Sequence, residues 1–165
     1  MINAHEYVYA YPFREIDEPS GGYVRQHPNQ NKLERQNNLK IGIILAQLGY
    51  KVWLLPVSNE PGVRSADAWL EDEAIFIEFK WCQTPSAAAI DKAIQKAKKQ
   101  APYILLEIDC DIRPQILITG VEDRCQRPEN QEVIKEVWLL WKGELFKFSR
   151  EEIVDKSWTL RLTIK

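Results

Sequence analysis

Two segments of the chain repeat their apolar side chains with the spacing of an α-helix. In residues 32–49, KLERQNNLKIGIILAQLG, apolar residues recur every three or four positions and fill most of the second half. This pattern predicts a helix that is largely buried. Asn31 is a favourable cap for its start, and Gly49 is a favourable residue to end it. Residues 84–101, TPSAAAIDKAIQKAKKQA, predict a second helix that begins at a Thr or Ser cap.

The other apolar segments are rich in β-branched and aromatic residues or alternate with polar ones, which is typical of strands. Two of them flank the acidic turn 71–73 and two flank Lys142-Gly143, so each pair predicts a hairpin. Residues 58–65 predict a loop. The predicted strands are residues 7–11, 50–57, 66–70, 74–81, 103–109, 115–120, 136–141, 144–149 and 159–164.

The order of these elements predicts an α/β fold with a mixed central β-sheet. Residues 31–110 read helix, strand, hairpin, helix and strand, which is an αβββαβ core. Residues 1–30 are rich in turn formers and predict an irregular N-terminal arm, whereas residues 111–165 predict a β-rich extension with a C-terminal hairpin. Because the chain has 165 residues, of which 45% are hydrophobic, we expect residues 1–165 to form one domain.

Composition and charge narrow the classes of function. The formal net charge is −2 and the pI is about 5.8, which argues against a protein that coats nucleic acid non-specifically. The three cysteines form no C-x-x-C pair, so a zinc knuckle or a disulfide framework is not expected. No leader-type N-terminus and no apolar run of membrane-span length is visible. We therefore expect a cytoplasmic site of action and no membrane partner.

The stretch SADAWLEDEAIFIEFKW, residues 65–81, holds the candidate chemistry. Asp67 lies on the first arm of the predicted hairpin. Glu78 and Lys80 lie two apart on the second arm and therefore share one face of their strand. A Glu and a Lys on an inner strand are costly unless they pair or bind something. The carboxylates at 71–73 fit a solvated turn.

Two carboxylates that a hairpin brings together, Asp67 and Glu78, can supply the hard oxygen ligands that Mg²⁺ or Mn²⁺ requires. Lys80 beside them can polarise a water or stabilise charge on a phosphoryl oxygen. These are the parts that hydrolysis of a phosphodiester needs. The structural alternative is a surface hairpin in which Glu78 and Lys80 form an ordinary same-face pair.

The αβββαβ order, with Asp67 at the second strand and Glu-Phe-Lys at 78–80 on the third, resembles the PD-(D/E)XK nuclease superfamily of restriction and repair enzymes. The resemblance covers residues 30–110, with Ala66 in place of the Pro of the family's name. It implies a restriction-endonuclease-like core in which Asp67 and Glu78 bind the metal and Lys80 positions water. The family's helix carboxylate would be Glu34, which equally fits a solvated acid in the first turn of its helix.

A narrower resemblance links the segments GYKVWLLP, RSADAWL, FIEFK, IDKAIQKAKKQAPYILLEID and VIKEVWLLWKGELFKF to toxin domains of contact-dependent inhibition systems and related phage-borne nucleases. Lys99-Gln100 matches a Lys-Gln pair that is frequent in them at the end of the second helix, which would give Gln100 a role in supporting substrate or water. The resemblance implies RNA, tRNA in particular, as substrate, with DNA as the second choice, and an immunity protein as partner.

Other side chains could contact nucleic acid. Lys92, Lys96 and Lys99 make the second helix basic, so they could line a phosphate-binding strip, although a solvated helix face explains them equally well. Trp81 directly follows Lys80 and could stack on a base.

Two alternatives to the metal-dependent nuclease stay open. Some relatives of the toxin domains belong to a metal-free ribonuclease fold, in which His27 near Arg25 would carry protons. The other alternative is a non-catalytic binding module that retains the nuclease fold.

Overall fold

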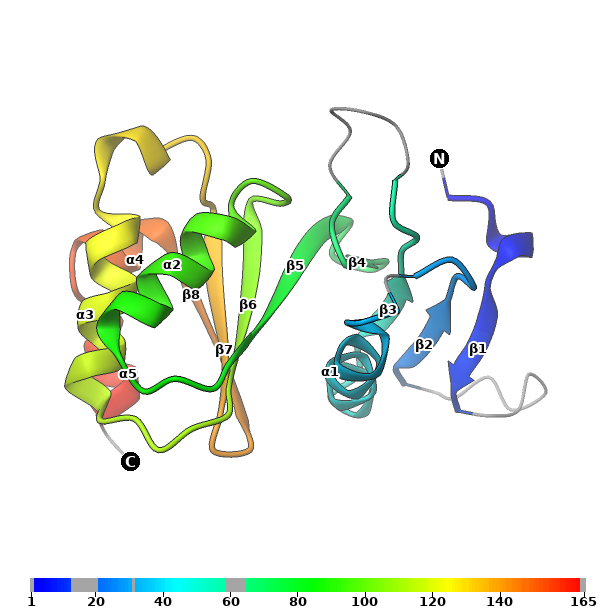
Figure 1. Ribbon diagram of the computed structural model, residues 1–165, viewed down its shortest axis with the longest axis horizontal. Coiled ribbons are helices and arrows are strands. Elements are labelled where there is room, and N and C mark those ends of the chain that lie inside the picture. Colours follow the sequence, from blue (N-terminus) through cyan, green and yellow to red (C-terminus); the bar gives the residue numbers. More distant parts are fainter. Residues whose placement is uncertain (1, 13–20, 31, 59–64, 164–165) are drawn as a thin grey trace. The chain divides into compact units, whose positions relative to one another are not determined.

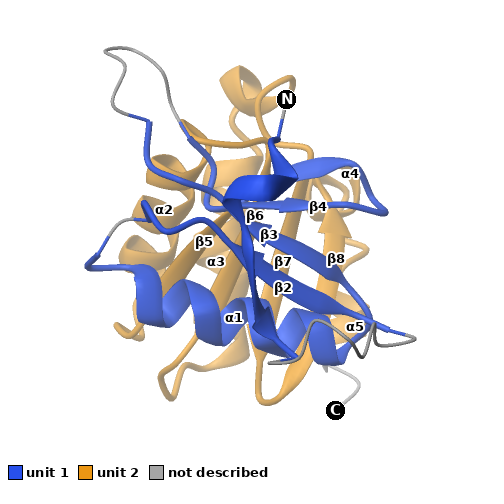
Figure 2. Cartoon of the chain, turned by 90° about the vertical axis from the view of Figure 1, so that its right-hand side faces the viewer, with its two compact units in different colours: residues 1–77 blue, residues 78–165 orange. Residues whose placement is uncertain are grey.

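The chain forms two compact units, Met1–Ile77 and Glu78–Lys165, whose elements are labelled in Figure 1 and coloured by unit in Figure 2. Asn31, the predicted cap, and most of the predicted loop 58–65 lie outside the described residues. The computed structural model describes residues 2–12, 21–30, 32–58 and 65–163.

The first unit contains a mixed sheet with one helix, α1 (Arg35–Gln47), and a one-turn 3₁₀ helix, η1 (Ala4–Glu6). β2 and β3 run parallel, and the other neighbouring strands of this unit run antiparallel. In order across the sheet the strands are β1 (Val8–Tyr11), β2 (Tyr23–Gln26), β3 (Lys51–Leu54), β4 (Ala68–Leu70) and the first residues of β5 (Ile75–Cys82).

The N-terminal arm is more regular than predicted. β1 lies where a strand was expected, but β2 was not predicted, because its four residues show too short a pattern to stand out among turn formers. Pairing with β3 makes it a strand: Tyr23 aligns with Lys51 in a parallel register, and the Tyr23 N–H donates to the Tyr50 carbonyl at 3.1 Å.

Helix α1 covers one face of this sheet. It begins at Arg35 and not at the predicted Lys32, and Gly49 ends it as predicted, with a φ of +100° that favours glycine. Gly42 faces the sheet: a Cβ built there would lie 3.5 Å from Val24 and 3.6 Å from Leu54. The apolar half of the helix therefore packs on the apolar side of β2 and β3.

The second unit contains the rest of β5, a parallel pair of strands, an antiparallel hairpin and four helices among the residues that the structure describes. Figure 1 shows the helices on one side of the strands, where they bury a shared apolar core. The elements are α2 (Ala87–Ala97), β6 (Tyr103–Ile108), α3 (Pro114–Cys125), the 3₁₀ helix η2 (Pro128–Asn130), β7 (Glu136–Trp141), β8 (Glu144–Ser149), α4 (Arg150–Val154) and α5 (Thr159–Thr163).

The predicted α/β class and mixed strand pairing are confirmed, but two predicted strands are wrong. Residues 115–120 lie in α3, which begins with Pro114 in the first turn, a position that proline favours. Residues 159–163 form α5, although their apolar residues alternate. Leu160 is 66% exposed whereas Leu162 is buried, so only one of the two alternating leucines faces the core. The extension after residue 110 thus holds three α-helices beside its two strands.

None of the helices that the structure describes has the length and apolar composition that a membrane span requires.

Close packing of α2 on α3 predicts the effect of a methyl group at Gly120. A Cβ there would lie 2.7 Å from Ile90 Cβ and 2.8 Å from the Ala87 carbonyl, so the two helices must separate. We expect Gly120→Ala to lower the free energy of unfolding by about 1–3 kcal/mol in urea denaturation. Gly42→Ala is the matched control. It makes ordinary contacts in another helix and should be neutral or stabilise by up to about 1 kcal/mol. Equal effects of the two changes would contradict the packing.

Candidate functional site

Asp67 is held by helix α1 and strand β3 in the first unit. It directly precedes β4, and its backbone carbonyl accepts the Leu55 N–H at 2.9 Å. Its Oδ1 accepts a hydrogen bond from Asn38 Nδ2 at 3.0 Å, and Asn38 is only 9% exposed. A buried amide thus orients the carboxylate. Asn38 was not predicted, because it stands among polar residues in the first half of the helix and the sequence gives it no distinguishing signal.

Glu34 lies one helical turn before Asn38. It is the N-cap residue of α1, its side chain is exposed, and it makes no side-chain capping bond. Its carbonyl accepts the Asn38 N–H at 2.9 Å. Residues four apart share a helix face, so Glu34 is on the side of α1 that reaches Asp67.

Glu78 and Lys80 come together in the second unit, on one face of β5. Glu78 is 4% exposed, and Lys80 Nζ lies 3.6 Å from its Oε2. Phe79 between them is buried on the other face. The predicted same-face pair is therefore present, and it is not a surface pair, because its carboxylate is inside the protein.

A second buried carboxylate, Glu107 on β6, is 4% exposed. The sequence analysis did not single it out, although a Glu in the apolar run YILLEI is an unusual residue for an inner strand. Among the residues that the structure describes, no group of three or more His, Cys, Asp or Glu side chains is placed to hold an ion. Asp67 lies in the first unit and the other two carboxylates in the second.

Trp81 presents a half-exposed indole beside the Glu78–Lys80 pair in sequence. Its ring is 49% exposed, and its Nε1 donates to Asp109 Oδ2 at 2.9 Å. The hydrogen bond holds the ring in one orientation at the end of β5. A base that stacks on the ring would therefore lose less binding free energy to the ordering of this side chain.

Only two of the three lysines predicted for the basic strip lie on α2 itself. Lys92 and Lys96 are exposed on α2. Lys98 donates to Asn130 at 2.6 Å and so belongs to the structural contacts of the unit. Lys99 and Gln100 are exposed in the turn after α2, because the helix ends at Ala97. The prediction that this helix extends over residues 84–101 is therefore too long at its C-terminal end, and Gln100 lies beyond it.

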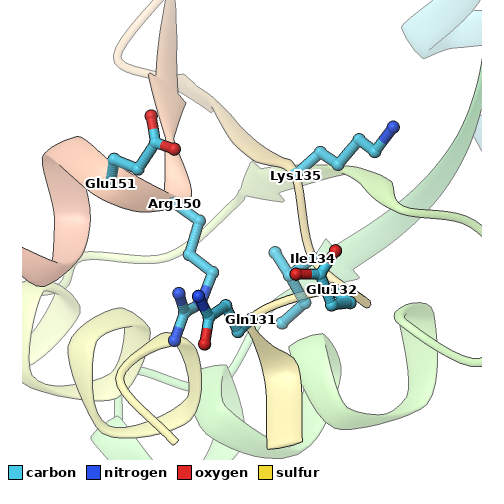
Figure 3. Close-up of a pocket in the computed structure, with 6 residues that line it drawn as sticks. All are labelled: Gln131, Glu132, Ile134, Lys135, Arg150 and Glu151. Atoms are coloured by element: carbon cyan, nitrogen blue, oxygen red, sulfur yellow. The ribbon is translucent and has the colours of Figure 1, made fainter. Parts of the chain in front are cut away.

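A polar pocket of about 360 Å³ lies elsewhere in the second unit (Figure 3). Arg150 in its wall donates to the backbone carbonyl of Cys125 at 2.9 Å and to that of Arg127 at 3.4 Å. Its guanidinium therefore binds carbonyl groups at the C-terminal end of α3. The pocket mixes both signs of charge and is lined by Gln131, Glu132, Ile134, Lys135, Arg150 and Glu151.

Two of the three cysteines, Cys82 and Cys125, are buried thiols. Burial raises the pKa of Cys82 to about 12, with Cys110 and Glu107 adding to the shift and Lys80 opposing it. Burial likewise raises the pKa of Cys125 to about 12. Only the thiolate is reactive, so these residues serve as core side chains.

No protein-family model and no curated protein matches the sequence. A solved chain of the CdiA-CT/CdiI toxin and immunity complex from Burkholderia pseudomallei is similar in structure, with a TM-score of 0.52 and 16% sequence identity. The similarity covers 74% of this chain and 91% of that chain. At this identity it shows a related fold.

The raised thiol pKa predicts a loss of stability in alkali. The unfolded thiol titrates near its ordinary value of 9.0, so between pH 9 and about 12 the unfolded chain has lost a proton that folded Cys125 keeps. The free energy of unfolding should therefore fall as pH rises through this range, by up to about 1.4 kcal/mol per pH unit for each thiol. Cys125→Ala should make the fall shallower in urea titrations. Val121→Ala, in the same core, should lower stability without changing the slope. Identical slopes for wild type and Cys125→Ala would contradict this.

Proposed function

We propose that this chain is a metal-dependent nuclease of the PD-(D/E)XK type. The order α1, β3, β4, β5, α2, β6 corresponds to the αβββαβ core of that superfamily. Asp67 stands before the second of these strands, and Glu78 and Lys80 stand on the third. The related fold of a chain from a toxin and immunity complex supports the toxin-like part of this proposal.

The observation that carries the proposal is the setting of the three residues on their own strands. Asp67 directly precedes β4, and the buried amide of Asn38 donates to its Oδ1 at 3.0 Å. Glu78 is buried on β5 and shares one strand face with Lys80, whose Nζ lies 3.6 Å from its Oε2. Carboxylate oxygens are the ligands that fit Mg²⁺ or Mn²⁺.

When bound, the ion would polarise the phosphoryl oxygen and lower the pKa of a water. Asp67, oriented by Asn38, and Glu78 would hold it. Lys80 would orient the attacking water and stabilise the negative charge that grows on the phosphoryl oxygen. Glu34, one turn from Asn38, would accept a hydrogen bond from that water, and Gln100 would support the substrate from the turn after α2.

RNA, with tRNA first, is the proposed substrate class, and DNA is the second choice. This rests on the resemblance to toxin domains, as does the proposal that an immunity protein is the partner and that the chain acts in the cytoplasm. Lys92, Lys96 and Lys99 would contact phosphates.

A second candidate is the metal-free ribonuclease. The observation that favours it is the pairing of His27 Nε2 with Glu6 Oε2 at 3.2 Å, while its Nδ1 accepts the Asn29 N–H at 3.1 Å. A carboxylate that orients an imidazole is the arrangement that general acid–base catalysis uses.

The site assignment predicts the effect of removing either carboxylate. We expect Asp67→Ala and Glu78→Ala to lower Mg²⁺-dependent cleavage of tRNA by at least about 100-fold, because each removes a ligand whose charge no other group replaces. Glu73→Ala, an exposed carboxylate of the nearby turn, should keep full activity. Cleavage is measured on gels with tRNA and plasmid DNA, with circular dichroism as the folding control. Activity that persists in excess chelator would favour His27 and the metal-free mechanism, and unchanged cleavage by both variants would end the proposal.

If Lys92, Lys96 and Lys99 contact phosphates, the affinity for tRNA should depend on which lysine charges are removed. Changing Lys92, Lys96 and Lys99 together to Gln should weaken tRNA binding and reduce the slope of log affinity against log salt by about 2–3, since each phosphate contact releases about one counterion. Changing the exposed Lys135, Lys142 and Lys156 to Gln alters net charge equally and should leave the slope unchanged. Equal slopes for the two triple variants, measured by fluorescence anisotropy, would exclude the strip.

A further inference from the structure

A row of large side chains crosses the sheet of the first unit. The register pairs Tyr9 with Arg25, Arg25 with Trp53, Trp53 with Trp69 and Trp69 with Phe76, so one residue from each of five strands stands in line. We call these five residues the aromatic row. Directly paired residues of neighbouring strands point to the same side of a sheet, so the row lies on one face.

This face is the one that α1 does not cover. The helix packs on Val24 and Leu54, through Gly42. Those two residues alternate with Arg25 and Trp53 along their strands and therefore point to the opposite side.

Arg25 fixes a positive charge within the row. Its guanidinium carbon lies 4.4 Å from the ring centroid of Tyr9, 5.0 Å from that of Tyr23 and 4.6 Å from that of Trp53. It also donates to the Tyr9 hydroxyl. The arginine is thus a permanent part of the aromatic face, and it already occupies the position that a cationic ligand of these rings would take.

A pocket of about 450 Å³ opens at the other end of the row, lined by Ile2, Trp53, Trp69, Glu71 and Phe76. Phe76 is 49% exposed, and Trp69 is partly exposed. Its lining therefore combines three aromatic side chains with one aliphatic side chain and one carboxylate.

The carboxylate of Glu71 is held in place. Its Oε2 accepts the Tyr23 hydroxyl, and burial together with this hydrogen bond raises the pKa of Tyr23, which stays a neutral donor at physiological pH. Oε1 of Glu71 is the other oxygen with which the pocket can accept a donor. An aromatic wall with a fixed acceptor selects a planar ring that carries N–H groups on its edge.

We propose that this pocket binds an unpaired nucleobase of the substrate, stacked on Trp69 and Phe76, with its amino or imino N–H donating to Glu71. The inference rests on the proposed nuclease function and names a subsite for it. Guanine fits best because it presents two adjacent N–H donors, whereas uracil flanks its single N–H with carbonyls that the carboxylate repels. A base is favoured over an ammonium group because Arg25 already supplies the cation of the row.

The pocket also lies near one carboxylate of the proposed site. Trp69 on β4 stands two residues after Asp67, and two residues of a strand span about 7 Å. A base stacked on Trp69 would therefore lie about one nucleotide along the strand direction from Asp67.

The test is an NMR titration of the full chain carrying Glu78→Ala, without metal, with 5′-GMP and 5′-UMP. We expect GMP to shift the indole N–H signals of Trp53 and Trp69 and to bind more tightly than UMP. Phe76→Ala should weaken GMP binding about 5- to 100-fold, as loss of one stacking ring does. Glu71→Gln should reverse the preference toward UMP, because an amide can donate to the uracil carbonyls.

Leu48→Ala, an exposed apolar residue of α1's end, is the matched control and should bind GMP normally. Phe76 is half exposed, so its variant should fold, which thermal unfolding checks. Equal GMP affinity in the Glu78→Ala chain with and without Phe76→Ala, no shift with either nucleotide, or preferential binding of tetramethylammonium would each overturn the base pocket. Nucleotide binding that follows these expectations, together with a wild-type chain that cleaves no nucleic acid in the presence of metal, would support the pocket and overturn only the nuclease proposal.

Discussion

The register of β4 against β5 is the constraint on which the aromatic pocket of the first unit depends. Side chains alternate along a strand, so a slip of one residue would turn Trp69 and Phe76 to the opposite face of the sheet. The turn between the strands sets this register: the Ala74 N–H donates to the Glu71 carbonyl at 3.2 Å, and Ala74 has a φ of +54°. A short acidic turn thereby controls where the neighbouring aromatic and charged residues point.

Two charge pairs in the second unit show why burial alone does not mark a site. Arg124, 5% exposed, binds Asp91 through two hydrogen bonds of 2.6 and 3.1 Å and joins α3 to α2. Because this ion pair joins two helices, a structural role accounts for its burial. Glu78 and Lys80 pair within a single strand, with the carboxylate buried. The residue types and their shared strand face, and not burial, are the reason to assign this pair a chemical role.

The two faces of the first sheet carry different kinds of side chain. Aliphatic residues such as Val24 and Leu54 bury one face under α1, whereas the other carries rings, Arg25 and a carboxylate. Stacking needs no net positive charge, which is consistent with nucleic-acid recognition by a chain whose formal charge is −2. In the proposed function, contacts with the rings would give base specificity, and the few exposed lysines of α2 would attract the phosphate backbone.

Local pattern was enough to place α1, α2, the two hairpins and the shared face of Glu78 and Lys80, because helix and strand periods are properties of neighbouring residues. It misassigned residues 115–120, since a short apolar run fits a strand or a buried helix equally well until packing decides. Only the tertiary structure paired β2 with β3, joined Asn38 to Asp67 and aligned five side chains of five strands into a row. These contacts link residues far apart in the chain, and no sequence period encodes which distant segments meet.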